Sequence, residues 1–153
     1  VLTGPWQFGK VDQGVVALWV MHHVFKRPLS YIGYGGTGKQ VRDFLHVEDM
    51  WSAILEQLEH FEKYSGETFN IGGGREMSTS LRELTDVCVQ VTGNSVPIEH
   101  VAETRSLDVP IYITDYSKWS AASGWLPKRN VSETVRDIAA WAKQHQAELE
   151  QLQ

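Results

Sequence analysis

Short strand-like segments alternate with helical segments along this chain, and the alternation limits the fold more than any other feature. The strand candidates are Leu29–Ile32, Thr68–Ile71, Pro97–Val101 and Ile111–Thr114. Apolar patterns predict helices over 12–27, 48–62, 81–92 and 115–123, and a final helix from Ser132 that carries Leu149. Strands that alternate with helices predict an α/β fold with parallel pairing. So few strand candidates indicate part of a larger sheet.

Local signals mark where several of these helices begin and end. Ser80 and Glu83 have the spacing of a capping box, in which each side chain accepts from the other residue's backbone amide. Gly93 and Gly124 stand where two helices should stop. The Glu- and Gln-rich end, from about 144 to 153, is open to fraying. We therefore expect one domain over 1–153 with a frayed tail.

Composition argues against several classes of partner. The formal net charge is −5, which is opposite in sign to the basic face that nucleic-acid binding requires. No apolar run approaches the roughly 18 residues of a membrane helix. The single cysteine, Cys88, excludes an internal disulfide and indicates a reducing, cytoplasmic compartment. The chain begins at Val1, in a segment typical of mid-sequence, so we interpret it as a fragment or processed product.

The glycine-rich loop Gly33–Gly38 matches two phosphate-binding patterns, and neither is convincing. It satisfies G-x-G-x-x-G, but the residues after it favour extended structure, so no helix N-terminus is expected where a pyrophosphate would bind. It also nearly matches a P-loop, but Gln40 stands where that motif requires Ser or Thr. A turn between two strands is the better interpretation.

The segment Gly38–Asp49 carries the most specific pattern in the chain. It resembles the G-x-x-x-R-D-[FY]-x-H-V-x-D signature of extended short-chain dehydrogenase/reductases that act on nucleotide sugars. Four further matches follow in order, similar to the family's F-N-[IV]-G-G, S-L-x-E-L, R-x-x-D…D-x-[ST]-K and G-W-x-P-K motifs: Phe69–Gly74, Ser80–Leu84, Arg105–Lys118 and Gly124–Lys128. The resemblance covers nearly the whole chain. It implies the C-terminal part of that fold, a partial parallel sheet with a small substrate-binding α/β subdomain.

A narrower resemblance lies at the start of the chain. Gly4–Gly14 is similar to the G-x-x-Q-F-[AG]-x-x-D-Q-G segment of CDP-paratose 2-epimerases, also called CDP-tyvelose epimerases. Such enzymes are implied to oxidise a sugar carbon transiently with bound NAD and to return the hydride to the opposite face. The match favours this subgroup over UDP-glucose 4-epimerases and sugar dehydratases.

The resemblance also implies a substrate site, because a nucleotide diphosphate needs guanidinium groups, a carboxylate and an apolar wall. Arg42 and Arg105 match the diphosphate-binding arginines, and Asp108 matches the residue that accepts from the ribose. Phe44 matches the aromatic position, and Gln7 lies in the subgroup's substrate loop. The alternative is a surface ion pair, Arg42 with Asp43 or Arg105 with Asp108.

Four other polar residues are assigned structural roles. His46 and Asp49 belong to the signature, and we expect hydrogen bonding and helix capping from them. His22 and His23 are adjacent on a helix and therefore diverge by about 100°, so one buried and one surface ring is expected instead of a metal pair. Cys88 lies on an apolar stripe and is expected in the core.

The family's catalytic pair is missing from these residues. In Tyr-x-x-x-Lys the lysine lowers the tyrosine pKa, but none of the tyrosines here has Lys four positions later, and no cofactor-binding glycine motif precedes them. We therefore expect NAD in a full-length parent and none in this chain, which should bind a CDP- or UDP-linked sugar without catalysis. The alternative is a truncated module that binds a nucleotide sugar or associates with itself. A homo-oligomer is expected because a missing half leaves surface uncovered.

Overall fold

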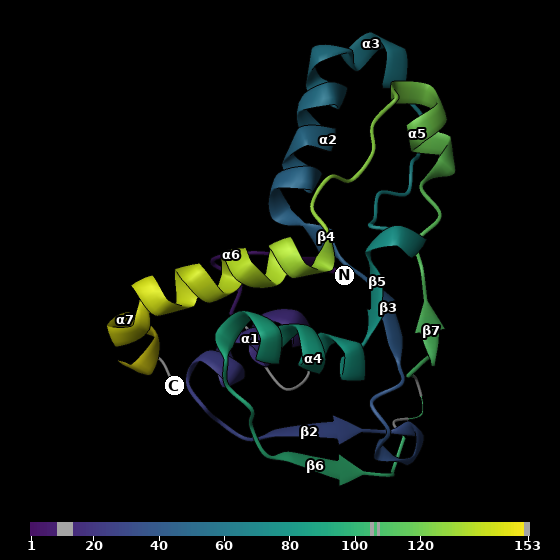
Figure 1. Ribbon diagram of the computed structural model, residues 1–153. Coiled ribbons are helices and arrows are strands. Elements are labelled where there is room, and N and C mark those ends of the chain that lie inside the picture. The colour runs from purple at the N-terminus through teal and green to yellow at the C-terminus, as the bar shows by residue number, and fades with distance from the viewer. Residues whose placement is uncertain (9–13, 105, 107, 152–153) are drawn as a thin grey trace.

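The fold is known from a computed structural model that describes residues 1–8, 14–104, 106 and 108–151. Its elements in chain order are β1 (Leu2–Thr3), α1 (Val15–Val24), β2 (Leu29–Ile32), the 3₁₀ turn η1 (Tyr34–Gly36), β3 (Val41–Asp43), β4 (Leu45–His46), α2 (Val47–Glu59), α3 (Phe61–Tyr64), the 3₁₀ turn η2 (Arg75–Met77), β5 (Ser78–Ser80), α4 (Leu81–Thr92), β6 (Ile98–Val101), β7 (Ile111–Tyr112), α5 (Ser117–Ser123), α6 (Val131–Gln144) and α7 (Gln146–Gln151). Figure 1 shows α2, α3 and α5 at one end of the molecule and α1, α4 and α6 with β2 and β6 at the other. The α/β class expected from the sequence is confirmed.

The strands form three short sheets, and most of their pairings are parallel. β1 pairs with β4, and β2 pairs with β6, both in parallel. In the third sheet, of order β5-β3-β7, β3 is antiparallel to β5 and parallel to β7. β3 lies at the centre of that sheet, so residues before β7 come close to residues of the glycine-rich loop that leads into β3.

The larger hydrophobic cluster joins α1, α4 and α6 over β2. The side chains of Val16, Val20, Leu84 and Ile138 are fully buried in it. Burying each side chain of this size contributes about 1.5–3 kcal/mol to the free energy of folding. α1 is apolar on nearly every side because it is covered by both other helices. The helix predicted over 12–27 is therefore buried as expected, but it ends at Val24, before Pro28, and residues 12 and 13 lie outside the described part of the chain.

A smaller cluster joins α2 to α5 at the other end of the molecule. It contains Leu45, Ala53, Tyr64, Trp119 and Trp125 as buried residues. The rings of Tyr64 and Phe69 both meet Trp119 edge-on, at centroid distances of 4.9 and 5.0 Å. Phe44 and Leu45, consecutive in the chain, belong to different clusters, so the segment from β3 to β4 connects the two cores.

The predicted helix signals are confirmed at α4 and at two glycines. Ser80 Oγ accepts from the Glu83 amide at 3.2 Å, and a Glu83 carboxylate oxygen accepts from the Ser80 amide at 2.8 Å. Gly93 and Gly124 end their helices with φ of 74°, a conformation that favours glycine. The cap predicted at Ser132 is wrong: Asn130 caps α6 and forms a capping box with Glu133, which starts the helix earlier.

Other boundaries also differ from the predictions. Thr68–Ile71 is not a strand, because Lys118 binds the Thr68 carbonyl at 3.0 Å while Phe69 and Ile71 pack into the smaller cluster. The predicted helix 48–62 is divided at His60 into α2 and α3. The tail expected to fray, about 144–153, is helical through Gln151 and buries Leu149 in α7, separate from α6, while residues 152 and 153 lie outside the described part of the chain. No helix in the described part of the chain is long and apolar enough to cross a membrane.

Candidate functional site

Arg42 and Asp108, separated by 66 positions in the chain, form the centre of the candidate site. Arg42 Nη2 donates to Asp108 Oδ1 and to the Val109 carbonyl, both at 2.8 Å. Arg42 Nη1 donates to the carbonyl of Val41 at 2.8 Å. The two charged side chains are 23% and 29% exposed, so solvent and a ligand can reach both. Arg42 therefore pairs with Asp108 and not with Asp43, while the other pair weighed from the sequence, Arg105 with Asp108, involves a residue outside the described part of the chain.

The β3–β7 pairing explains this convergence. Arg42 is the middle residue of β3, and the Val41 amide donates to the Pro110 carbonyl at 2.9 Å. That bond sets the parallel register in which Arg42 lies opposite Tyr112. The segment that enters β7 thus passes beside the Arg42 side chain.

The glycine-rich loop contacts Asp108 through Tyr34 and is not a phosphate cradle. Gly33–Gly38 contains the turn η1 and continues into β3, so no helix begins after it, as expected from the sequence. Gly36 packs on β6 so closely that a Cβ would lie 2.9 Å from the Val101 amide nitrogen. Gln40, the residue that disqualified the P-loop pattern, donates to the Ile32 carbonyl at 2.6 Å.

Tyr34 is the residue of this site that sequence reasoning missed. Its amide donates to Thr104 Oγ1 at 2.8 Å, and its hydroxyl donates to the Asp108 carbonyl at 2.6 Å. Its φ is 49°, a left-handed conformation that is unusual for a residue other than glycine. Its position between two glycines is the only signal that could have drawn attention to it.

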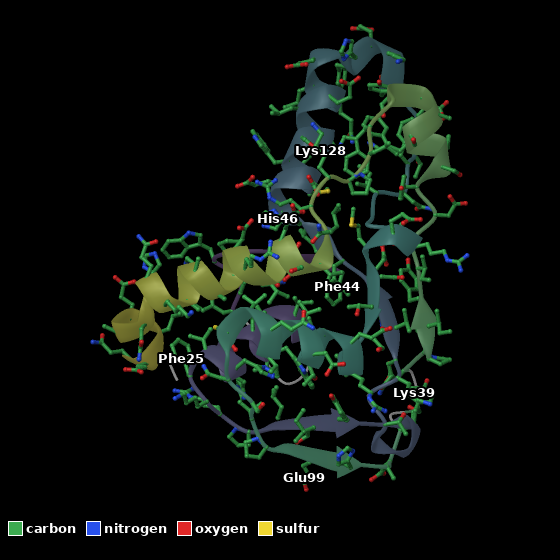
Figure 2. The ribbon with its side chains drawn as sticks, in the orientation of Figure 1. Phe25, Lys39, Phe44, His46, Glu99 and Lys128 are labelled. Carbon is green, nitrogen blue, oxygen red and sulfur yellow. The ribbon has the colours of Figure 1, made fainter. Side chains whose placement is uncertain are left out.

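Asp43 and Phe44 support the site from the buried side. Asp43 is completely buried, and its Oδ2 accepts from the amides of Gly73 and Gly74 at 2.9 and 3.2 Å. Phe44 is 3% exposed and belongs to the larger hydrophobic cluster. The predicted aromatic wall is therefore not formed by Phe44, whose ring is in the core (Figure 2).

Of the two remaining predicted site residues, only Gln7 lies in the described part of the chain, and its hydrogen bonds are not to this pair. Gln7 is engaged locally: its Oε1 accepts from Thr3 Oγ1 at 2.8 Å and its Nε2 donates to the Leu2 carbonyl at 3.0 Å. Arg105 lies outside the described residues, so its predicted role stays a prediction.

His46 and Asp49 have the structural roles expected for them. His46 Nδ1 accepts from the Glu48 amide at 3.1 Å and caps α2. Asp49 Oδ2 accepts from the amides of Lys128 and Arg129 at 3.1 and 2.9 Å, which ties α2 to the segment before α6. Burial lowers the pKa of His46 below its ordinary value, and the Arg129 cation acts in the same direction against nearby carboxylates.

The two histidines of α1 and the single cysteine are buried or exposed as the sequence predicted. His23 is buried, whereas His22 is partly exposed, as predicted. Cys88 is buried in the larger cluster, and burial raises the pKa of its thiol to about 12.

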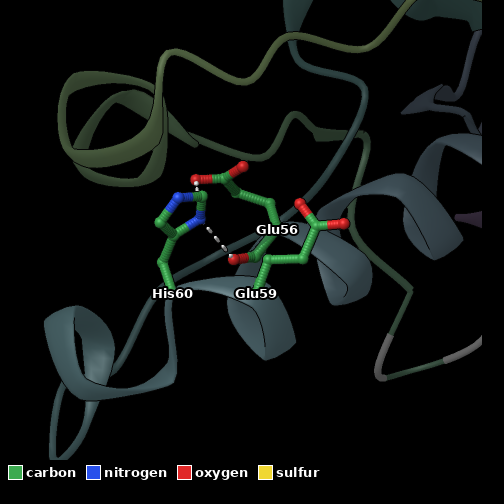
Figure 3. Close-up of side chains that lie close together, drawn as sticks. All are labelled: Glu56, Glu59 and His60. Atoms are coloured by element: carbon green, nitrogen blue, oxygen red, sulfur yellow. Dashed lines mark hydrogen bonds and ion pairs between the residues drawn. The ribbon is translucent and has the colours of Figure 1, made fainter.

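One group in the described chain has the composition of a cation site. Potential ligand atoms of Glu56, Glu59 and His60 lie within 4.8 Å of one another (Figure 3). His60 Nδ1 is 3.1 Å from Glu56 Oε1, which also accepts from Tyr64 at 2.8 Å. This group lies at the C-terminal end of α2, away from β3 (Figure 1), and is separate from the Arg42 site.

Comparisons with known proteins agree on one family. A sequence profile described as the NAD dependent epimerase/dehydratase family matches residues 1–72. The chain is 32% identical over 150 residues to the CDP-paratose 2-epimerase of Salmonella typhi, covering 92% of this chain and 42% of that protein. It is similar to the structure of a UDP-glucose 4-epimerase with UDP-glucose from Thermotoga maritima, with a TM-score of 0.79 and 27% identity, covering 95% of this chain and 44% of that one.

A third comparison supports the fold alone. The structure of UDP-glucuronic acid 4-epimerase from Bacillus cereus, in complex with UDP-glucuronic acid and NAD, matches with a TM-score of 0.79 at 22% identity, covering 94% of this chain and 43% of that one. The chain thus spans less than half the length of each of these relatives.

Proposed function

The chain belongs to the NAD dependent epimerase/dehydratase family, and from that premise we propose that it is the nucleotide-sugar-binding portion of an NAD-dependent sugar epimerase. The observation that carries the proposal is the convergence of Arg42 and Asp108 at 2.8 Å. A guanidinium beside a carboxylate matches the two polar parts of a nucleoside diphosphate. The guanidinium donates to the phosphate oxygens, and the carboxylate accepts from the ribose hydroxyls.

Ligand binding at this site exchanges one set of contacts for another. The Arg42 Nη2 group that now donates to Asp108 and Val109 can turn its N–H bonds to phosphate oxygens. Asp108 is then free to accept from a ribose hydroxyl. Because binding must first break an existing ion pair, the net gain is modest, and we expect dissociation constants for free CDP or UDP in roughly the millimolar range.

We assign the cytidine-linked sugar ahead of the uridine-linked one. The segment Gly4–Gly14 resembles that of CDP-sugar 2-epimerases, and the Salmonella relative that matches 92% of the chain is named CDP-paratose 2-epimerase. Binding of CDP in preference to UDP supports this assignment, and the reverse preference contradicts it.

The described residues do not fit the NAD that the family name implies. The loop Gly33–Gly38 enters β3, and a dinucleotide cradle requires the N-terminus of a helix at that point. We propose that NAD is bound by parts of the parent protein outside these 153 residues. No hydride-transfer step is assigned to any side chain here.

Chemical-shift perturbation tests the proposal directly. CDP and UDP should shift resonances of Arg42, Asp108, Val109 and the glycine-rich loop, and Arg42→Ala should abolish those shifts. Arg136→Ala removes an exposed arginine from α6 and is the matched control, for which binding should be unchanged. Arg105→Ala tests the second predicted arginine. Shifts scattered away from β3 and β7, or binding that survives Arg42→Ala, contradict the proposal.

A second candidate is a self-associating module without catalysis. Trp51, Leu58 and Phe61 on α2 and α3 are 54%, 63% and 62% exposed, which is unusual for large apolar side chains on one surface. This function predicts oligomers in sedimentation together with an absence of nucleotide binding.

A further inference from the structure

Tyr34 connects both ends of the segment Thr104–Asp108 to the glycine-rich loop. Its backbone amide donates to the Thr104 side chain, and its ring hydroxyl donates to the Asp108 carbonyl, at 2.8 and 2.6 Å. The two contacts join positions separated by 70 and 74 residues. The backbone of Asp108 is therefore located by Tyr34, while its carboxylate is located by Arg42.

The loop around Tyr34 is itself held firmly in place. The amides of Gly33 and Gly35 donate to the carbonyls of Val101 and Ala102 at 2.8 and 3.3 Å. His100 Nδ1 is 2.6 Å from the Gly36 carbonyl. These contacts connect the loop to the end of β6, so the Tyr34 hydroxyl is a fixed point against which Asp108 is placed.

The backbone conformation at Tyr34 is unfavourable for tyrosine. A φ of 49° is adopted at low cost by glycine, and glycines stand on both sides of this position. A non-glycine residue persists in this conformation where the surrounding contacts hold it there. The only hydrogen bond of the Tyr34 side chain in the described structure is the one to Asp108.

We propose that Tyr34 is a positioning residue of the nucleotide site. It fixes Asp108 so that the carboxylate accepts from the ribose hydroxyls while Arg42 donates to the phosphate oxygens. The inference rests on the proposed function and extends it from the two charged groups to the residue that sets their geometry. The proposal predicts that Tyr34 affects the binding of one kind of ligand and not of another. A nucleoside diphosphate uses both Arg42 and Asp108, whereas inorganic pyrophosphate offers only phosphate oxygens and uses Arg42 alone.

The test compares Tyr34→Phe with the unmodified chain, using CDP, UDP and pyrophosphate as probes. Removing one hydroxyl should weaken binding of the nucleoside diphosphate that the chain binds better by about two- to tenfold, the range expected for one hydrogen bond. Pyrophosphate binding should be unchanged. The matched control is Tyr116→Phe, which removes a hydroxyl that makes no hydrogen bond in the described structure and should change neither affinity.

A measurement without ligand accompanies the titrations. In the unmodified chain the ion pair should slow rotation of the Arg42 guanidinium group, so that separate side-chain Nη–H resonances are seen at low temperature. In Tyr34→Phe these resonances should merge as the Asp108 backbone loosens.

The outcomes distinguish this inference from the function on which it rests. If the unmodified chain binds neither nucleotide, the proposed function fails and the ligand-binding role of Tyr34 fails with it. If the unmodified chain binds and Tyr34→Phe binds equally well, only the role of Tyr34 is overturned. Equal weakening of nucleotide and pyrophosphate also overturns it, because a general loss of structure acts on both ligands alike.

Discussion

His46 should make the stability of this protein depend on pH, because the cap of α2 requires a neutral ring. Its side chain is 1% exposed, and Nδ1 accepts from the Glu48 amide, so the ring proton is on Nε2, which lies 3.5 Å from Asp137 Oδ2. A second proton would have to be placed on Nδ1, where it faces an N–H donor. Burial is the main cause that lowers the pKa of His46, Arg129 lowers it further, and Asp137, Glu48 and Asp49 oppose the shift.

The direction of the effect follows from this lowered pKa. In the unfolded chain the imidazole binds a proton as pH falls through its ordinary value of 6.5, while the folded ring resists protonation. The contribution of the neutral His46 ring to the free energy of unfolding is therefore fully present above about pH 6.5, and it is lost as pH falls from there towards the lower pKa of the folded state. The loss cannot exceed about 1.4 kcal/mol per pH unit for one histidine. The buried His23, whose pKa is also lowered mainly by burial, adds to the same loss.

His46→Asn separates capping from titration. Asparagine is a good N-cap residue, so this variant should be within about 1 kcal/mol of the unmodified chain at about pH 8. Below about pH 6.5 its stability should fall less steeply, by up to about 1.4 kcal/mol per pH unit. His46→Ala loses the cap and should be destabilised by about 0.5–2 kcal/mol at about pH 8. Because it also lacks the imidazole, its stability should fall as gently below about pH 6.5 as that of His46→Asn. Urea unfolding followed by tryptophan fluorescence measures all three chains. An unchanged pH slope in His46→Asn would refute the reasoning.

Four further predictions concern other parts of the molecule. Asp43→Ala should cost about 2–3 kcal/mol in urea unfolding, because it leaves the buried amides of Gly73 and Gly74 without an acceptor, and Asp43→Asn should cost less because it retains an acceptor oxygen. Cys88 should react with Ellman's reagent only after denaturation, since its thiol is buried and its pKa is about 12; rapid labelling of the native chain would contradict the structure. The chain should sediment as a dimer or larger species through the apolar surface of α2 and α3, and Leu58→Glu should shift it towards the monomer; a monomeric unmodified chain counts against this expectation. Calorimetric titration with NAD should give no saturable heat, and a stoichiometric micromolar isotherm would show that these 153 residues contain a cofactor site.

Local signals in the sequence predicted local structure well. The capping box of Ser80 and Glu83 and the glycines that end α4 and α5 need only neighbouring residues to form, and each is found where its pattern stands. The helix cap was misplaced at Ser132 because Asn130 is an equally good cap and has Glu133 at the right spacing. Asn130 and Ser132 are competing cap positions within three residues. The capping box of Asn130 with Glu133, which makes both hydrogen bonds, is the one that forms.

Features that depend on distant contacts were predicted less well. Thr68–Ile71 has strand composition, but the Thr68 carbonyl is bound by Lys118, 50 positions away. A phenylalanine at position 44 is compatible with a ligand-binding wall or with the core. It lies in the core because the β3–β4 segment passes between the two hydrophobic clusters, which a local pattern does not reveal. The only signal at Tyr34 was its place between two glycines, which does not reveal its partners because they lie 70 or more positions away.

The geometry at Arg42 follows from what is buried on the other side of β3. Successive side chains of a strand point to opposite faces, so a slip of one residue would bury Arg42 and expose Asp43. Asp43 prevents that slip, because its carboxylate accepts from two glycine amides in a space where even a Cβ on Gly73 would lie 1.9 Å from the Phe44 carbonyl oxygen. With Asp43 held inward, Arg42 must point outward, and the Val41–Pro110 hydrogen bond then brings Asp108 to it. The two consecutive residues of the Arg-Asp pair in the signature therefore serve opposite faces of β3: Asp43 holds the register, and Arg42 lies on the face where we propose that the nucleotide binds.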